Sequence, residues 1–511
     1  MDPTDLHPRL HTGEVADSDP PEAGNASVLE SFLRFLRAHW LKILAISAVI
    51  LTPCFWHRLI AASDLGSHLY NAWLAQLIER GQVHGLWIAR QWNNILFDYL
   101  LSGFGTIFSL NVSEKISVSI AVLVFFWGMF ALTCAATRRA PWFLLPVLVL
   151  FTYGWTFHMG FFNYYLSLGI SFFGIAIFWR GHGWERLLAF VIAPLVFLAH
   201  PLGLLWLFGA SAYVGIAEII PPRYQVLLFV CAAGSLFGVH QYFWHHYVVE
   251  ASPFPFYSMN GTDQLVLFGE RYQAVARAVL AFAIVSLGAD VIRRRREVGF
   301  WHFYNIPLQL LLLTLLAVPL LPRGVHFPDK TAAIALLTER LTSVTAAIGC
   351  CLLGAIRPSK WHLAGSLAIA AVFFTFLYQD TGVVNKLEAE AEQLVRTLPP
   401  DQRVMATILP LSGSRILIQH IIDRACIGHC FSYGNYEPGS GVFRVRAQPG
   451  NPYVLSDYEL VVEMEEGDYT VLPEDLPVYQ VYQCTPDGLH LCIRPLEEDE
   501  DNDRLGVHPD N

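Results

Sequence analysis

An aspartate and a histidine four residues apart have the types and spacing that acid–base chemistry needs. Asp64 stands just after the first long apolar run, and His68 follows in the segment AASDLGSHLYNAWLAQLIERGQ. Residues four apart share one helix face, so the pair could act as a general base with a partner or bind a divalent metal. We predict Asp64 and His68 as catalytic residues, and a divalent metal is a candidate cofactor that two ligands do not establish. Alternatively, Asp64 is only the N-cap of the following helix.

A second set of polar residues lies in or beside apolar runs, where burying a charge is costly and polar side chains are functional candidates. Arginine suits phosphate oxygens because its guanidinium can donate two parallel hydrogen bonds. Arg340, or Arg323 with Lys330, could therefore hold a phosphate or diphosphate head group. The structural alternatives are an internal Glu339–Arg340 ion pair and histidines that only mark span ends. The predicted substrate-binding residues are His158, Asn163, His200, Arg323, His326 and Arg340.

The composition places these candidates in a membrane protein. Of the 511 residues, 54% are hydrophobic and 15% are charged, and the mean hydropathy is +0.42. Soluble domains carry about 25% charged residues, which excludes an ordinary soluble enzyme, a disordered regulator and a nucleic-acid-binding protein. Residues 39–379 carry a net charge of +8, whereas residues 1–38 and 380–511 carry −4 and −14. This pattern is typical of a polytopic membrane protein with acidic ends.

Eleven apolar runs are interpreted as transmembrane helices, since about 20 apolar residues cross a bilayer. The stretch 186–219 is either two short spans hinged at Pro201 or one long kinked span. Asp98 and two glycines interrupt 94–110, which we interpret as interfacial or re-entrant. The expected spans are 39–60, 114–136, 141–157, 160–179, 186–199, 200–219, 224–245, 274–292, 303–321, 331–355 and 362–379.

Basic residues set the expected orientation of these spans. A cytoplasmic N-terminus and 11 spans put the C-terminal region outside and make 61–113 a large first outer loop. This predicts a multi-pass protein, most simply of a bacterial inner (cell) membrane. The short inner connections then contain Arg138, Arg139, Arg180, Arg186, Arg223, Arg293 to Arg296, Arg357 and Lys360.

Residues 380–495 are expected to form a small extracytoplasmic α+β domain. The stretch 380–398 has helical spacing, and the short alternating runs after it, SRILIQHIID and YELVVEM among them, are typical of strands. Residues 1–38 and 496–511 are polar or charged and are expected to be disordered. The domain's cysteines could form two disulfides, stay as free thiols or, with His429, bind a metal. They are Cys426, Cys430, Cys484 and Cys492.

The setting of Asp64 resembles that of the C-type (GT-C fold) membrane glycosyltransferases. The resemblance covers residues 39–379: an acid directly after the first span, a large outer first loop with a membrane-lying helix, and many spans before an outer C-terminal domain. Many members show two acids together in this loop, whereas Leu65 follows Asp64 here. The resemblance implies a mainly α, polytopic enzyme that takes a sugar from a polyprenyl-phosphate carrier and uses the first-loop carboxylate at the reaction centre.

The implied partners are a lipid-linked sugar donor, membrane lipids and a glycan, lipid or protein acceptor of the cell envelope, with no nucleic acid. Two other classes stay open. A transporter or flippase of an amphipathic substrate often shows internal repeats, and no convincing repeat is present in this sequence. A non-catalytic membrane assembly protein is the other alternative.

Overall fold

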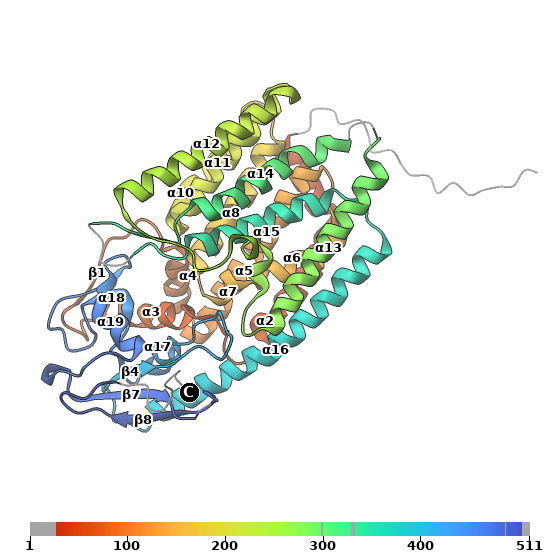
Figure 1. The fold of residues 1–511 in the computed structure, drawn as a ribbon. Coiled ribbons are helices and arrows are strands. Elements are labelled where there is room, and N and C mark those ends of the chain that lie inside the picture. Colours follow the sequence, from red (N-terminus) through yellow and green to blue (C-terminus); the bar gives the residue numbers. More distant parts are fainter. Residues whose placement is uncertain (1–26, 298–299, 329–332, 486, 503–511) are drawn as a thin grey trace, which may run out of the picture.

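The computed structural model describes residues 27–297, 300–328, 333–485 and 487–502. Helices dominate this part of the chain and form a bundle, with the strands and short helices of the C-terminal region gathered at one end (Figure 1). Within the described residues, six helices are long and apolar enough to cross a membrane. They are α5 (Leu110–Thr137), α8 (Phe162–Arg180), α11 (Pro201–Ile219), α12 (Pro222–His246), α13 (Arg271–Arg294) and α16 (Lys360–Val395).

The other expected spans coincide with shorter or more polar helices. The expected span 39–60 coincides with α1 (Val28–Ile50) and α2 (Thr52–Phe55). The expected span 331–355 coincides with α15 (Leu337–Ala355). Two further apolar segments are Trp142–His158 and Asn305–Leu320. Length and composition therefore support six spans in the described part of the chain, and the total of eleven stays a prediction. The two segments contain η1 (Trp142–Leu144), α6 (Leu145–Thr152), α7 (Trp155–His158) and most of α14 (Phe300–Leu320).

The long helices differ in how deeply they are packed. Of the most apolar window of α8, 83% is buried, whereas none of that of α12 is. Helix α8 lies against α5 where a Cβ added at Gly128 would come within 2.3 Å of the Gly169 carbonyl oxygen, so the missing side chain permits backbone contact. Helix α12 instead exposes apolar side chains such as Leu227 and Val230. An exposed apolar face of this kind suits a lipid environment.

Two expected interruptions occur in the structure. The stretch 186–219 is divided into α9 (Glu185–Val191), α10 (Ala193–Ala199) and α11, and His200 has an extended backbone directly before Pro201 at the start of α11. In the other stretch, 94–110, the helix α4 (Leu96–Gly105) has ten residues. Ten residues rise about 15 Å, which is too short to cross a bilayer.

Helix α16 continues from the bundle into the C-terminal region without a break over 36 residues. The expected domain boundary at residue 380 therefore falls inside a helix. Beyond it, Val384, Leu387, Ala391 and Val395 are buried on one face, which is the face that the helical spacing indicates. This continuity couples the C-terminal region rigidly to the bundle.

The C-terminal region has an α+β arrangement within the described residues. Its four-stranded sheet has the order β5-β4-β7-β8, in which β4 is parallel to β5 and β7, and β8 is antiparallel to β7. The strands are β4 (Arg403–Thr407), β5 (Phe431–Ser432), β7 (Val478–Gln483) and β8 (Leu491–Pro495). The helices of this region are α17 (Ile421–Cys426), α18 (Tyr436–Ser440), α19 (Tyr458–Glu466) and the 3₁₀ turn η4 (Pro473–Asp475).

The strands expected in SRILIQHIID and YELVVEM are wrong. The first segment runs into α17, and the second forms most of α19. Helix α19 begins at the N-cap Asp457, whose side chain accepts a hydrogen bond from the Glu459 N–H, and ends at Gly467 with φ of 86°. The cap and the left-handed glycine are helix signals that outweigh the strand preference of the two valines.

The chain ends are more ordered than expected where they are described. Helix α1 begins at Val28 with Ser27 as its N-cap, so residues 28–38 are helical, while residues 1–26 lie outside the described part. Residues 497–502 pack on the C-terminal region through Asn502, which is fully buried and donates to the Met464 carbonyl. The cysteines form the disulfides Cys426–Cys430 and Cys484–Cys492.

The C-terminal region is joined to the first loop as well as to α16. Strand β1 (Leu86–Ile88) of the loop pairs with β6 (Val445–Ala447), and the Ser432 N–H donates to the Tyr70 hydroxyl of α3 (Leu65–Glu79). Buried Arg424 forms ion pairs with Glu114 of α5 and Glu388 of α16. The remaining elements are the paired strands β2 (Val248–Glu250) and β3 (Gly324–His326) and the 3₁₀ turns η2 (Phe256–Ser258) and η3 (Thr262–Leu265).

Candidate functional site

Asp64 occupies the turn before α3 and is held there by its backbone. Its N–H donates to the Met159 carbonyl at 3.1 Å, and a Cβ added at Gly160, whose φ is +81°, would lie 2.7 Å from the same nitrogen. The Asp64 side chain makes no capping hydrogen bond to α3, and 18% of it is exposed. The N-cap interpretation therefore does not account for the carboxylate.

His420, from the loop before α17, faces Asp64 across the contact between the first loop and the C-terminal region. Its Nε2 lies 3.8 Å from Asp64 Oδ1, and its Nδ1 lies 3.2 Å from Asp423 Oδ2. The Ser432 hydroxyl donates to Asp423 Oδ1. The His420 side chain is only 7% exposed. An imidazole held between two buried carboxylates is well placed to carry a positive charge.

The electrostatics of this group follow from burial and neighbouring charge. Burial raises the pKa of Asp64, and the charges of His420, His68 and Arg340 oppose that rise. Burial would lower the pKa of His420, but the hydrogen bond and charge of Asp423, with Glu465 and Asp64, raise it to about 9. At neutral pH the geometry therefore favours an imidazolium beside Asp64.

Arg340 and the neutral imidazole of His200 form the donor side of the same site. An Arg340 Nη1 lies 3.3 Å from His200 Nε2, and the guanidinium stacks 4.3 Å from the Phe161 ring centroid. The Leu202 N–H donates to His200 Nδ1. A neutral imidazole that accepts at Nδ1 carries its proton on Nε2, so two donors then face each other. Arg340 Nε is buried without a hydrogen-bond partner among the described residues.

We name Asp64, His200, Arg340, His420 and Asp423 the open cluster. Its members come from the first loop, the α10–α11 break, α15 and the start of α17. Arg340 lies near Asp64 because its guanidinium stacks on Phe161, and a Cβ at the preceding Gly160 would lie 2.7 Å from the Asp64 nitrogen. This arrangement combines a carboxylate able to take a proton with cationic donors able to stabilise an anion.

His68 belongs to a second buried group, centred on Asp98 of α4. His68 Nδ1 lies 2.9 Å from Asp98 Oδ1, and Asn163 donates to Asp98 Oδ2 at 2.9 Å. Glu437 Oε1 lies 3.8 Å from His68 Nδ1 and accepts from the Ser67 hydroxyl at 3.2 Å. We call this hydrogen-bonded group the closed cluster. Its members are Ser67, His68, Asn71, Asp98, Asn163, Asn435 and Glu437.

The pKa shifts in the closed cluster follow from its internal pairing. Burial would lower the pKa of His68, but the charge and hydrogen bond of Asp98 and the charges of Glu437 and Asp64 raise it to about 9. Burial opposes ionisation of Asp98, yet His68 and Arg444 hold its pKa below the ordinary value. Burial raises the pKa of Glu437 to about 7. His68 and Asp98 thus form a buried ion pair, and the predicted catalytic role of His68 stays a prediction.

The other predicted substrate-binding residues are in different surroundings. His158 Nδ1 faces the Ala61 carbonyl at 2.8 Å, and Asn163 is part of the closed cluster. Arg323 forms an ion pair with buried Glu339 at 2.8 Å, so the partner of Glu339 is Arg323 and not its neighbour Arg340. His326 forms an exposed pair with Glu250 between β3 and β2. Lys330 lies outside the described residues.

The sequence reasoning missed the residues that the C-terminal region contributes. His420 and Asp423 are three apart, which places them on one face at the start of a helix but on opposite faces of a strand. Because SRILIQHIID was interpreted as a strand, His420 and Asp423 were expected on opposite faces and were not recognised as a pair. Glu437 had no sequence signal, since its partners Ser67 and His68 lie about 370 residues away along the chain.

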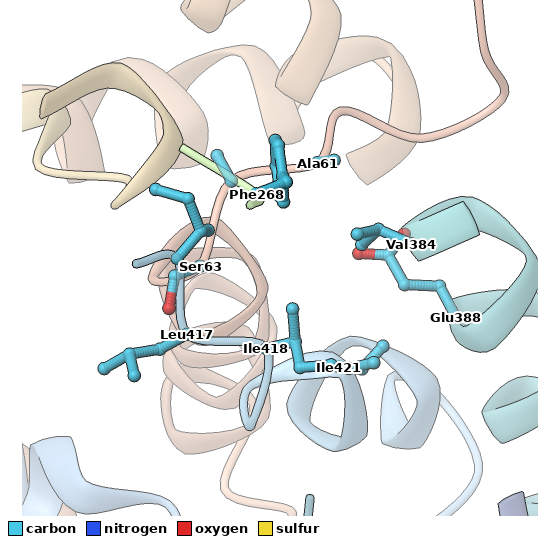
Figure 2. A pocket seen from close by; sticks show the side chains of 10 residues that line it. Ala61, Ser63, Phe268, Val384, Glu388, Leu417, Ile418 and Ile421 are labelled. Carbon is cyan, nitrogen blue, oxygen red and sulfur yellow. The ribbon is translucent and has the colours of Figure 1, made fainter. Parts of the chain in front are cut away.

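A small hollow lies beside Asp64, between the first loop, α16 and the C-terminal region (Figure 2). Its volume is about 260 Å³, including space open to solvent. Ser63, Phe268, Leu417 and Val384 contribute to a largely apolar lining, and Glu388 is the charged residue in it.

Among the described residues, no group of three or more His, Cys, Asp or Glu side chains is arranged to hold a metal ion. The divalent metal suggested by Asp64 and His68 therefore gains no support, because His68 is already paired with Asp98. Comparison with known proteins adds no family. Neither a protein-family model, nor a curated protein, nor a solved structure matches the chain. The function is therefore argued from the site.

Proposed function

We propose that the protein is a polytopic membrane glycosyltransferase that moves a sugar from a polyprenyl-phosphate donor to a glycan, lipid or protein acceptor. The observation that carries the proposal is the open cluster. There, a largely buried carboxylate without a capping hydrogen bond and a guanidinium both pack on the Gly160–Phe161 turn, and the guanidinium has a buried nitrogen without a partner among the described residues. A base and an anion site close together are what displacement of a phosphate at an anomeric carbon requires.

In the proposed reaction, an acceptor hydroxyl attacks the anomeric carbon of the donor sugar. Asp64 accepts the hydroxyl proton as the new carbon–oxygen bond forms. The bond between the anomeric carbon and the phosphate oxygen breaks, and its electron pair leaves with the polyprenyl phosphate. Arg340 and His200 stabilise the negative charge that develops on that oxygen.

The donor arrangement at His200 supports an anion at this place. With Nδ1 accepting from the Leu202 N–H, the Nε2–H and the Arg340 N–H are both donors and lie side by side, where one acceptor beside them can bind both. A phosphate oxygen satisfies both donors, and the free Arg340 Nε offers a further hydrogen bond. The Glu339–Arg323 pair leaves Arg340 free of its neighbouring carboxylate.

The arrangement of arginines supports a site on the outer face, with the N-terminus cytoplasmic and the C-terminal region outside. Arg139 donates to the Gly354 carbonyl, Arg294 to the Ala355 carbonyl, and Arg357 pairs with Glu297, so three of the expected inner connections meet. They meet near the end of α5, whereas Glu114 near its start accepts from the Ile60 N–H beside the site. The 28 residues of α5 span about 42 Å.

The test uses purified protein in lipid nanodiscs with short-chain polyprenyl phosphates, each bearing one radiolabelled sugar, and an extract of envelope glycans and lipids as acceptor. The wild type is expected to release polyprenyl phosphate and label an acceptor. Asp64→Asn should abolish this while the variant folds and inserts normally. The matched control is Asp457→Asn, a capping aspartate of α19 on the protein surface. Equal product from Asp64→Asn would refute the proposed base.

The rival is a transporter or flippase of an amphipathic substrate, for which a buried cation at a helix break would also be useful. Nanodiscs have no closed compartment, so covalent product in them excludes transport as the sole activity. Movement of the same lipid-linked sugars across liposomes, with no covalent product for any sugar, would favour the transporter. A non-catalytic assembly protein predicts neither product nor movement.

A further inference from the structure

The C-terminal region places a charged group at Asp64 that the first loop cannot supply itself. His420 Nε2 is 3.8 Å from Asp64 Oδ1, and the opposite edge of the ring is held by Asp423. We propose that His420, oriented by Asp423, is a positioning residue that keeps the Asp64 carboxylate ionised through its positive charge. The C-terminal region then contributes His420 and Asp423 to the site. This inference rests on the proposed role of Asp64 as the base.

The distance between the two groups is set by backbone contact. A Cβ added at Gly66 would lie 2.3 Å from the His420 carbonyl oxygen, so the first turn of α3 touches the loop before α17 directly. Gly66 and Asp64 belong to the turn at the start of α3. His420 and Asp423 belong to the turn at the start of α17. Such contact leaves no room for a side chain or water to separate the two turns. The imidazole therefore stays beside the carboxylate.

The second support is that Asp423 is itself well held. Its Oδ1 accepts from the Ser432 hydroxyl and its Oδ2 faces His420 Nδ1. Ser432 is anchored by its N–H to Tyr70 of α3. This chain of hydrogen bonds runs from α3 through β5 to Asp423 of α17 and ends at His420, so it fixes the ring from the side opposite Asp64.

Both positive and negative groups surround Asp64 and His420. Of the positive groups, His420 has the largest effect on Asp64. Asp64 is also influenced by His68 of α3, Arg340 of α15 and Asp423 of α17, and the Tyr436 ring of α18 packs on His420. Glu465 of α19 acts on both Asp64 and His420. Burial raises the pKa of Asp64, and His420 is the strongest of the groups that lower it. Loss of the imidazolium should therefore let the carboxyl hold its proton to higher pH.

The test reads the ionisation of Asp64 directly and needs no substrate. Full-length protein with ¹³C-labelled aspartate carboxyl groups is titrated in nanodiscs by infrared spectroscopy. The Asp64 band is identified as the one missing in Asp64→Asn. Replacing an opposite charge at this distance should raise the titration midpoint of Asp64 in His420→Gln by about one to three pH units. Asp423→Asn should shift it less than His420→Gln does, because Asp423 supports the charge of His420 while its own charge raises the pKa of Asp64.

Two further variants separate charge from structure. His420→Lys retains the positive charge and should return the midpoint towards that of the wild type. His429→Gln removes a histidine of the same segment that faces the Leu398 carbonyl, and it should leave the midpoint unchanged. If His420→Gln does not fold, as judged by size-exclusion elution, His420→Asn takes its place, and His420→Lys remains the charged counterpart.

The outcomes distinguish this inference from the proposed function. An unchanged midpoint in His420→Gln, or a raised midpoint in His420→Lys equal to that in His420→Gln, overturns the inference. Glycosyl transfer that survives Asp64→Asn overturns the role of Asp64 as the base instead, whatever the titration shows, and the absence of any covalent product from the wild type overturns the proposed function. A raised midpoint together with surviving transfer would show that the ion pair exists but does not serve a base.

Discussion

The closed and the open cluster are neighbouring groups of buried histidines and carboxylates that differ in how completely they satisfy themselves. In the closed cluster, Asp98 accepts from His68 and Asn163, and Asn71 and Asn435 bond each other. In the open cluster, the Arg340 Nε lacks a partner among the described residues. Part of the Asp64 side chain is exposed.

The difference separates a structural role from a ligand-binding role. Buried polar groups that satisfy one another fix the position of the elements that carry them, whereas a buried donor without a partner costs free energy unless a ligand supplies the acceptor. The closed cluster joins α3, α4, α8 and the loop at α18. It therefore aligns α3, whose first turn carries Asp64.

The largest expected effect comes from breaking the closed cluster. Asp98→Asn removes the nearest counter-ion of buried His68 and leaves only Glu437 at 3.8 Å, and breaking such a pair costs up to about 3–5 kcal/mol of unfolding free energy. Asp64→Asn should cost about 1 kcal/mol or less, because that carboxylate has no direct hydrogen bond to lose from the helix cap. Reversible denaturation in mixed micelles measures both.

The control for this comparison is Asp487→Asn, a change at an exposed loop residue. It should leave the unfolding free energy within about 0.5 kcal/mol of the wild type. If Asp98→Asn and Asp64→Asn were equally destabilising, the division into a structural and a binding cluster would be incorrect.

The second effect is on anion binding at the open cluster. Arg340→Gln should weaken binding of farnesyl phosphate, a short prenyl phosphate, by about 10- to 100-fold. A charge-assisted hydrogen bond contributes roughly 1.5–3 kcal/mol. Isothermal titration calorimetry on protein in nanodiscs gives the dissociation constant.

Arg323→Gln is the matched comparison, because Arg323 is already paired with Glu339. It should lower stability and leave the affinity for farnesyl phosphate nearly unchanged. Weakening in Arg323→Gln but not in Arg340→Gln would move the anion site to Arg323.

The third effect is a pH dependence of stability. His68 and Glu437 have folded-state pKa values of about 9 and about 7, both raised above their ordinary values. The folded protein thus binds their protons more tightly than the unfolded chain does. Their contribution to stability is complete below the ordinary pKa of each group and is lost as the pH rises through the raised value. Unfolding free energy should therefore fall between pH 6 and pH 9, by about 3 kcal/mol through His68 and about 1 kcal/mol through Glu437.

Asp98→Asn sharpens this prediction, since Asp98 is the main cause of the raised His68 pKa. The variant should show a shallower decline between pH 7 and pH 9, measured by the same denaturation experiment at each pH. Asp98 itself, whose pKa is lowered, acts only in acid, where its loss of charge reduces stability. A stability that rises from pH 6 to pH 9 would contradict the assigned pairing.

Hydropathy located the long helices because each transmembrane helix satisfies its own backbone hydrogen bonds, so the local sequence carries the signal. The break at Pro201 and the shortness of α4 followed from local residues in the same way. The extent of α16 did not, because the change in composition near residue 380 marks a change of surroundings and not an end of the helix. Likewise, Val461 and its valine neighbour suggested a strand where the caps of α19 determine a helix.

The site was predictable only where one residue carried the signal by its position. Asp64 stands out because an acid directly after an apolar run is unusual and costly. Its partners could not be found in this way, since His420 lies more than 350 residues further along the chain. Such pairings depend on how the C-terminal region folds against α3. The same holds for His68, whose pairing with Asp98 requires the turn between α3 and α4.

The smallest expected effect concerns His326, which the sequence placed among the substrate-binding residues. In the structure, its side chain is 47% exposed and pairs with Glu250, which is 44% exposed, between β3 and β2. Exposed pairs of this kind contribute about 0–1 kcal/mol, because water and salt screen them. His326→Gln should therefore change neither the unfolding free energy by more than about 1 kcal/mol nor the affinity for farnesyl phosphate. A loss of affinity as large as that of Arg340→Gln would extend the anion site beyond the open cluster, to the loop that carries β3.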